Sequence, residues 1–152
     1  MATIEAQDRD EIVDEFVAKL AAVTRAKEAA RGPAIEGLQR IVGAIRGNPG
    51  TGQVRRLVAF LGGLYNGPRF PFDLTDLRSL DAELADACLD VLRYDHFGQA
   101  EVHTWGVTDG DELNGWLESY GLYYAAQRRR IAGELYRDRY GEGGHPDEGC
   151  CG

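Results

Sequence analysis

The chain has 152 residues, of which 43% are hydrophobic and 28% are charged, and its formal net charge is −8. This length and composition predict a single globular domain with a substantial core. No apolar run approaches the roughly 20 residues of a membrane span, and the acidic N-terminus lacks the basic start and apolar middle of a signal peptide. We therefore expect a cytoplasmic protein.

The charge is distributed unevenly along the chain. Residues 1–24 carry −4, residues 25–72 carry +6, residues 73–118 carry −10, and residues 119–152 balance. Basic and acidic helices that pack beside each other in one fold explain such a pattern. The same asymmetry also provides separate acidic and basic surfaces for a partner.

Two amphipathic helices are predicted before residue 47. They cover residues 8–30 and 34–46, and Gly32-Pro33 is expected to end the first and start the second. The periodicity of the first helix fits a helix folded back on the core or one paired with its copy in a dimer, so the oligomeric state is open. Its apolar stripe comprises Ile12, Val13, Phe16, Val17, Leu20 and Val23.

The segment that follows imitates the glycine spacing of a phosphate-binding P-loop. Gln53 occupies the position of the phosphate-binding lysine, and Val54 that of the magnesium-binding hydroxyl. We therefore interpret the segment as a turn between helices, in which Thr51 or Asn48 caps the next helix.

That next helix is predicted over residues 52–66. Its interior contains Gly62-Gly63, which would cost an exposed helix roughly 1 kcal/mol each relative to alanine. The pair predicts close packing of a neighbouring helix, or a bend.

A fourth helix is predicted from residue 74 to about 95, with Asp73 as its N-cap. In such a helix Asp81 points toward the buried stripe and needs a partner. We expect Arg55 to provide it, as a structural ion pair.

Four acids of the predicted fourth helix lie on one outward line. Such a line is usually a solvated face, but it can also be a contact surface that steers basic partners. The candidate partner-binding residues are Asp76, Glu83, Asp86 and Asp90.

Residues 96–108 are expected to be irregular or to hold a short strand-like piece at 100–105. The spacing of His96 and His103 matches no standard metal-ligand motif, and we expect neither a metal nor another cofactor. Cys88 is predicted to be a small buried hydrophobe. Cys150 and Cys151 are adjacent in a glycine-rich tail, which is not a secreted disulfide pattern.

Two further helices are predicted after residue 108. The acidic run from Asp109 to Glu112 resembles a capping box and opens the fifth helix, and Gly121 separates it from a sixth that reaches about Tyr140. The sixth helix carries three arginines that diverge by about 100° each. With two arginines of the third helix they form a candidate basic patch of Arg55, Arg56, Arg128, Arg129 and Arg130.

The predicted fold class is therefore all-α: a compact bundle of about five to six helices, with at most a short extended piece near residues 100–105. The predicted parts are an N-terminal amphipathic helix over 1–31, a helical core domain over 32–140, and a disordered glycine-rich tail over 141–152.

The block from Leu38 to Trp116 resembles a family of uncharacterised small proteins found on bacterial plasmids, integrative elements and phages. The family's tryptophan pair is replaced here by Leu64-Tyr65. The resemblance implies a mobile-element setting and carries over no catalytic residues. The matching pieces are Thr51-Gly52-Gln53, the run from Arg55 to Leu61, and the run from Phe72 to Leu77 with Asp81.

Three functions fit these features. We expect a non-catalytic accessory factor that binds another protein or complex, since no catalytic constellation is recognisable in the sequence. An alternative is a defence inhibitor of the anti-CRISPR type, whose acidic helix face mimics nucleic acid. A second alternative is a DNA-binding regulator that uses the basic patch, although the net charge disfavours direct nucleic-acid binding.

Overall fold

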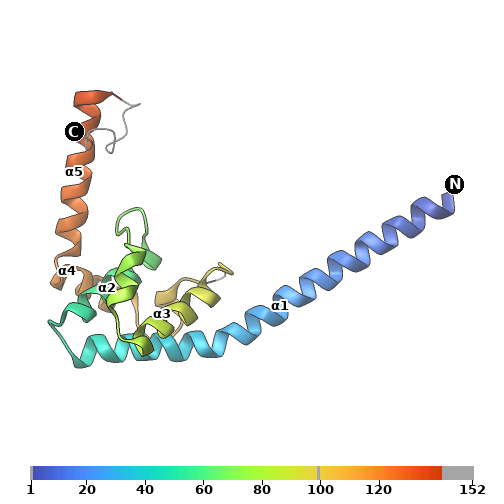
Figure 1. The fold of residues 1–152 in the computed structure, drawn as a ribbon, viewed down its shortest axis with the longest axis horizontal. Coiled ribbons are helices and arrows are strands. Elements are labelled where there is room, and N and C mark those ends of the chain that lie inside the picture. The colour runs from blue at the N-terminus through green and yellow to red at the C-terminus, as the bar shows by residue number, and fades with distance from the viewer. Residues whose placement is uncertain (1, 99, 142–152) are drawn as a thin grey trace.

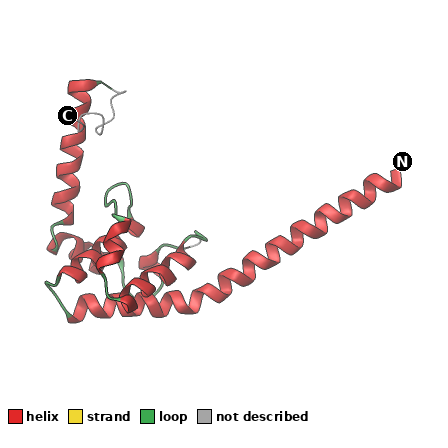
Figure 2. Ribbon diagram, viewed as in Figure 1, coloured by secondary structure: helices red, strands yellow, loops and turns green. Residues whose placement is uncertain are grey.

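All regular structure in the part of the chain that the structure describes is helical. The computed structural model describes residues 2–98 and 100–141, and Figure 2 shows no strand among them. The predicted all-α fold is confirmed. The elements are α1 (Ala2–Gly47), α2 (Gly52–Tyr65), the 3-10 helix η1 (Leu74–Ser79), α3 (Ala82–Asp95), the 3-10 helix η2 (Val102–Thr104), α4 (Gly110–Ser119) and α5 (Leu122–Tyr140).

The bundle is built on the second half of α1. Figure 1 shows α3 lying along this half, with α2 and α4 beside them, while the first half of α1 extends away and α5 rises from the other end. The core gathers aliphatic side chains from four helices, and their burial provides the main stabilisation of the bundle. The largest fully buried side chains include Leu38, Ile41, Leu57, Leu61, Val91, Leu113 and Leu117.

The predicted break at Gly32-Pro33 is wrong, because α1 is one helix of 46 residues with Pro33 inside it. A proline removes one backbone donor and crowds the preceding turn, which costs about 3 kcal/mol but does not forbid a helix. Ala30 and Ala34, on either side of Pro33, are both buried in the bundle. This packing holds the helix together, and α1 bends where it leaves the bundle (Figure 1).

The expected turn between α1 and α2 is confirmed. Thr51 is the N-cap of α2, and its hydroxyl accepts a hydrogen bond from the Val54 N–H at 3.3 Å. The expected close packing at Gly62-Gly63 is also confirmed. A Cβ on Gly62 would lie 2.7 Å from Leu117 Cδ2, so α4 approaches α2 closely enough that any larger residue at this position would displace the Leu117 side chain.

The predicted fourth helix is two elements. Asp73 does cap a helix, since its carboxylate accepts from the Thr75 N–H at 2.8 Å, but this helix is the short η1. The chain then becomes extended at the buried Leu80, and α3 begins at Ala82. Asp81 is therefore the N-cap residue of α3 and not a member of a buried stripe.

The predicted start of α4 and the predicted break between α4 and α5 agree with the structure. The carboxylate of Asp109 accepts from the Glu112 N–H at 2.8 Å and opens α4, and Gly121 has a left-handed φ of 71° between α4 and α5. Of the described residues between α3 and α4, only those of η2 form a regular element. The predicted boundary between residues 31 and 32 falls inside α1, and the tail from residue 142 onward lies outside the described residues.

Candidate functional site

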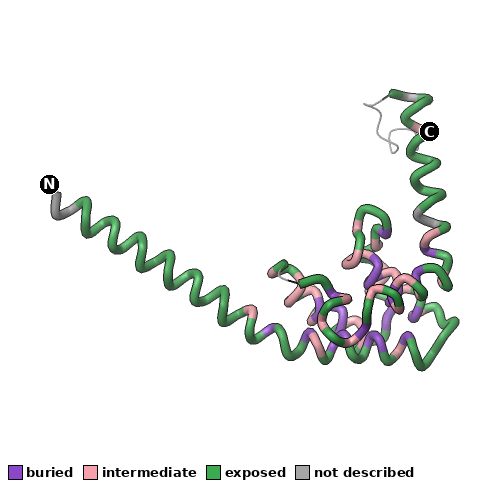
Figure 3. Tube along the Cα trace, turned by 180° about the vertical axis from the view of Figure 1, so that it is seen from behind, coloured by how far each residue is buried: buried purple, intermediate pink, exposed green. Residues whose placement is uncertain are grey.

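The stripe predicted on the first helix is solvent-exposed. In the described part of the chain no other element covers it, and Figure 3 shows the first half of α1 exposed along its length. Such a row of large apolar side chains on one face is typical of an interaction surface. The exposed fractions of these side chains are 52–66%, and the residues are Ile12, Val13, Phe16, Val17, Leu20 and Val23. We call this set the α1 stripe.

The α1 stripe continues the face by which α1 packs in the bundle. Val23 is followed at seven-residue spacing by the buried Ala30, and Leu20 at twice that spacing by the buried Ala34. In the bundle this face meets α3, where a Cβ on Gly37 would lie 2.8 Å from the carbonyl oxygen of Ala87. One side of α1 is thus covered by a helix in its second half and open in its first half.

The candidate acidic face is divided between two elements. Asp76 belongs to η1 and lies 3.8 Å from Arg56, whereas the other three acids belong to α3. Among these, Asp90 lies 3.5 Å from Arg93, and Glu83 and Asp86 are exposed. The single outward line that was predicted required one continuous helix, so the structure does not bring the four acids together in that form.

The predicted ion pair between Asp81 and Arg55 is wrong. Among the described residues the carboxylate of Asp81 accepts from Gln53 Nε2 at 2.9 Å, and the Asp81 N–H donates to Gln53 Oε1 at 2.7 Å. The error follows from the helix break, since Asp81 at the start of α3 faces the first turn of α2. Gln53 is the residue that sequence reasoning missed here.

The candidate basic patch is partly assembled. Arg55 of α2 and Arg129 of α5 line one small groove of about 110 Å³, together with the chain near Phe72. Arg129 and Arg130 line a larger groove of about 840 Å³. Arg56 is engaged by Asp76 instead.

Arg69 completes this larger groove and was not predicted. Its guanidinium lies 4.5 Å from the ring centroid of Tyr123, and Tyr123 packs edge-to-face on Phe70 at 5.0 Å. The sequence signal for it was an arginine beside Pro68 in a turn. Arg128 departs from the patch and lies over Tyr124 at 5.8 Å.

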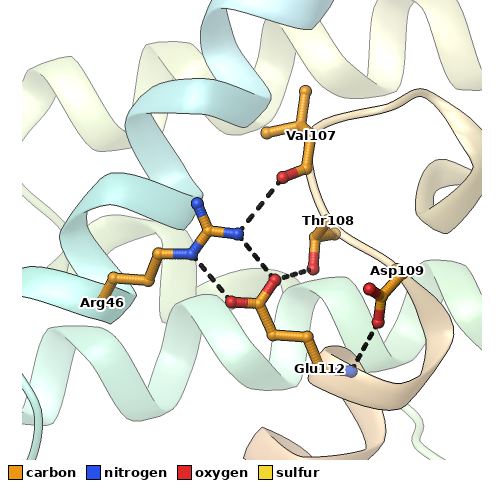
Figure 4. A network of polar contacts seen from close by, with 5 residues as sticks. All are labelled: Arg46, Val107, Thr108, Asp109 and Glu112. Carbon is orange, nitrogen blue, oxygen red and sulfur yellow. Dashed lines mark hydrogen bonds and ion pairs between the residues drawn. The ribbon is translucent and has the colours of Figure 1, made fainter.

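A polar network fastens the end of α1 to the start of α4 (Figure 4). Arg46 donates from Nε and Nη2 to the two carboxylate oxygens of Glu112, at 2.8 and 2.7 Å, and from Nη2 to the Val107 carbonyl at 3.3 Å. The Thr108 hydroxyl donates to the same carboxylate at 2.7 Å, and the Glu112 N–H donates to Asp109. Bidentate pairing of this kind fixes geometry as well as adding stability.

The hydrogen bond from Arg46 holds the pKa of Glu112 below its ordinary value, and the Thr108 hydroxyl adds to this effect. The same bond raises the pKa of Arg46. The network therefore keeps both charges at neutral pH and positions α1 against α4.

The remaining titratable candidates lie around residues 88–103. Among the described residues no group of three or more His, Cys, Asp or Glu could hold a metal ion. His103 Nδ1 lies 3.3 Å from a Glu101 carboxylate oxygen, and the His103 ring packs on Tyr65 at 5.1 Å. Burial raises the pKa of Asp95. His96 packs against the ring of its neighbour Phe97.

The prediction for Cys88 is confirmed, since its side chain is fully buried in the core. Burial raises the pKa of this thiol to about 12, which keeps it neutral and unreactive. Cys150 and Cys151 lie outside the described residues.

Comparison with known proteins yields one match, to a protein family. A family of unknown function (DUF7673) matches residues 34–117, which is more than half of the chain. No curated protein and no solved structure matches the chain. The matched range encloses the block from Leu38 to Trp116 on which the resemblance was based, and it leaves the α1 stripe and α5 outside. In the described residues no helix is both long and apolar enough to cross a membrane.

Proposed function

We propose that this chain, which belongs to the family of unknown function DUF7673, is a non-catalytic accessory factor that binds another protein chain through the α1 stripe. Since the function of the family is unknown, the proposal rests on the surface of the chain. A helix standing alone in water is marginal even for favourable sequences, since packing provides most helical stability in proteins. An isolated helix that also exposes six large apolar side chains gains both burial and helicity when a partner covers it. This exposed stripe is the observation that carries the proposal.

The biological setting is the part of the proposal that rests on resemblance. Similarity to proteins of bacterial plasmids, integrative elements and phages supports an accessory role in such an element. The acidic-mimic alternative has less support, because Asp76 and Asp90 already face arginines of the same chain. A nucleic-acid mimic relies on unpaired charge to compete for a basic groove.

Amine cross-linking in a bacterial lysate tests the proposal directly. The two lysines of the sequence, Lys19 and Lys27, both lie in the part of α1 that precedes the buried Ala30, so a cross-linker reports contacts of this segment. We expect both to link to another chain, whether a second copy or a host protein, as identified by mass spectrometry. The double variant Phe16→Asp/Leu20→Asp is expected to abolish the links.

The matched control is Ala18→Asp/Ala22→Asp. It adds the same two carboxylates to the opposite side of the same exposed helix segment and is expected to keep the links. Equal cross-linking in wild type and both variants, or none in any of them, contradicts the proposal.

A second candidate function has one specific observation in its favour. Arg69, Arg129 and Arg130 line one groove with Tyr123, and arginine and aromatic side chains together suit the phosphates and bases of a single-stranded nucleic acid. We expect such binding to weaken steeply with salt. Fluorescence anisotropy with a labelled oligonucleotide measures it, and Arg129→Gln/Arg130→Gln is the variant expected to lose it. Salt-independent binding, or binding equal in the variant, contradicts this candidate.

A further inference from the structure

The spacing within the α1 stripe defines the shape of what covers it. Val13, Phe16, Leu20 and Val23 alternate at spacings of three and four residues, which is the a and d pattern of a coiled coil. Ile12 and Val17 flank this seam at g and e positions and widen it. A seam of this kind is covered by another helix, which inserts its own side chains between these four.

The bundle supplies an internal example of the same contact. Further along α1, the same register leads to the buried positions Ala30, Ala34 and Ile41, and α3 is the helix packed most extensively on this part of α1. The exposed half thus presents a helix-binding face that no helix among the described residues covers. The missing element is a helix that lies along α1.

The charges of the exposed half select the direction of that helix. Residues 5–15 carry six acids and one base, whereas residues 16–31 carry four bases and one acid. Two copies in parallel would place acidic half beside acidic half and basic half beside basic half. Two antiparallel copies place each acidic half beside a basic half, which is the favourable arrangement.

We propose that a second copy of this chain covers the stripe, and that the two α1 helices pair antiparallel. The inference rests on the proposed function, in that it names the partner of the same stripe. In this pairing Val13 lies opposite the partner's Val23, and Phe16 lies opposite the partner's Leu20, as an a position meets a d position in antiparallel coiled coils. Each layer is apolar on both sides.

The mass of the full-length protein in solution is the first test. Light scattering after size exclusion is expected to give twice the chain mass of 16.7 kDa. Phe16→Asp/Leu20→Asp is expected to halve this mass, and Ala18→Asp/Ala22→Asp to leave it unchanged. Both pairs lie in the exposed half of α1, and circular dichroism of each variant shows whether the bundle stays helical.

Cysteine cross-linking tests the direction. In a background with Cys150→Ser and Cys151→Ser, we expect no disulfide dimer from Val13→Cys alone, because ten residues at about 1.5 Å each separate the two thiols by roughly 15 Å. A mixture of the Val13→Cys and Val23→Cys chains is expected to form a disulfide that joins one of each. Efficient cross-linking of Val13→Cys with itself overturns the antiparallel pairing.

The outcomes separate this inference from the function on which it rests. A monomer whose α1 lysines still cross-link to a host protein, with loss in Phe16→Asp/Leu20→Asp, overturns the dimer and leaves the proposed function standing. A monomer without any stripe-dependent link overturns both. A dimer whose mass is insensitive to Phe16→Asp/Leu20→Asp overturns the inference, because its interface lies elsewhere.

Discussion

At the scale of single residues, the pair formed by Gln53 and Asp81 ties the first turn of α2 to the start of α3. It consists of two hydrogen bonds, one in each direction, at 2.9 and 2.7 Å. Gln53→Ala removes both and is expected to lower the free energy of unfolding by about 1 to 2 kcal/mol, since each bond contributes about 0.5–1.5 kcal/mol net. Denaturant titration measures the change.

Arg55→Ala is the control for this prediction. Arg55 is exposed, lies two residues further along α2 and bonds to neither partner in the described residues, so its removal is expected to change stability by less than about 0.5 kcal/mol. A larger loss for Arg55→Ala than for Gln53→Ala would restore the ion pair that the sequence predicted.

A second residue-scale prediction concerns acid. The pKa of Glu112 lies below its ordinary value of 4.5, chiefly because Arg46 donates to its carboxylate. A carboxylate with a depressed pKa in the folded state stabilises the fold above its unfolded pKa, and this stabilisation is lost as the pH falls through the folded pKa. We therefore expect the stability advantage of wild type over Glu112→Gln to be constant near neutral pH and to disappear on acidification below about 4.5.

Thermal unfolding of the two proteins between neutral and acidic pH measures this difference. Because the other carboxylates titrate in both proteins, only the difference between the curves reports on Glu112. An advantage that stays unchanged well below the ordinary pKa would show that the charge of Glu112 does not matter to the network.

At the scale of elements, helices with a visible cap were predictable. Thr51 and Asp109 each precede an apolar-periodic run, and α2 and α4 begin one residue after them. The two errors came from segments where packing overrides the local pattern. Pro33 predicts the end of a helix, yet the burial of Ala30 and Ala34 on either side of it keeps α1 continuous.

The second error is the predicted fourth helix, where a continuous helix was expected and the chain has a break between η1 and α3. Apolar spacing continues from Leu77 to Leu84, and the one local sign of a break was Asp81 on the expected buried stripe, which is the N-cap residue of α3. The α1 stripe shares this ambiguity: a periodic stripe has the same sequence whether its own core or another chain covers it. Periodicity predicted the stripe itself, and only the fold shows that the described part of the chain leaves it open.

The contact between α1 and α3 gives an element-scale prediction. A Cβ on Gly37 would lie 2.8 Å from the Ala87 carbonyl oxygen, and backbone cannot yield as a side chain does. Gly37→Ala is therefore expected to destabilise the fold by about 1–3 kcal/mol. Gly43→Ala in the same helix meets nothing within 4 Å and is expected to stabilise it by up to about 1 kcal/mol. If denaturant titration shows that the free energy of unfolding falls in Gly37→Ala and rises in Gly43→Ala, the close approach of α1 to α3 is confirmed. A rise in both variants contradicts it.

At the scale of the whole molecule, the two halves of α1 differ in their surroundings. The second half packs against the other helices of the bundle, and the first half, which we call the arm, extends away from the bundle beyond a bend (Figure 1). At about 1.5 Å per residue the helix is roughly 69 Å long, more than twice the span of an ordinary domain helix. An antiparallel pair of arms would place the two bundles, each with its groove lined by Arg69, Arg129 and Arg130, at opposite ends.

The proposed pairing has a salt dependence that follows from its charge pattern. Screening shortens the reach of surface charge from about 10 Å at 0.1 M salt to about 3 Å at 1 M, so attraction between opposite halves fades. We expect the dissociation constant of the dimer to rise with salt, as measured by sedimentation equilibrium. A parallel pair would respond in the opposite sense, because screening would relieve repulsion between like halves.

Neutralising part of the acidic half provides the control. Glu5→Gln/Asp10→Asn removes two of the six acids of residues 5–15, at the g and e positions that flank the apolar seam, and leaves the seam itself unchanged. In the antiparallel pair this variant is expected to bind more weakly than wild type at low salt and to show a shallower salt dependence. Tighter association at low salt would instead reveal like charges in contact, because removing them relieves repulsion, and the two arms would then run side by side in the same direction.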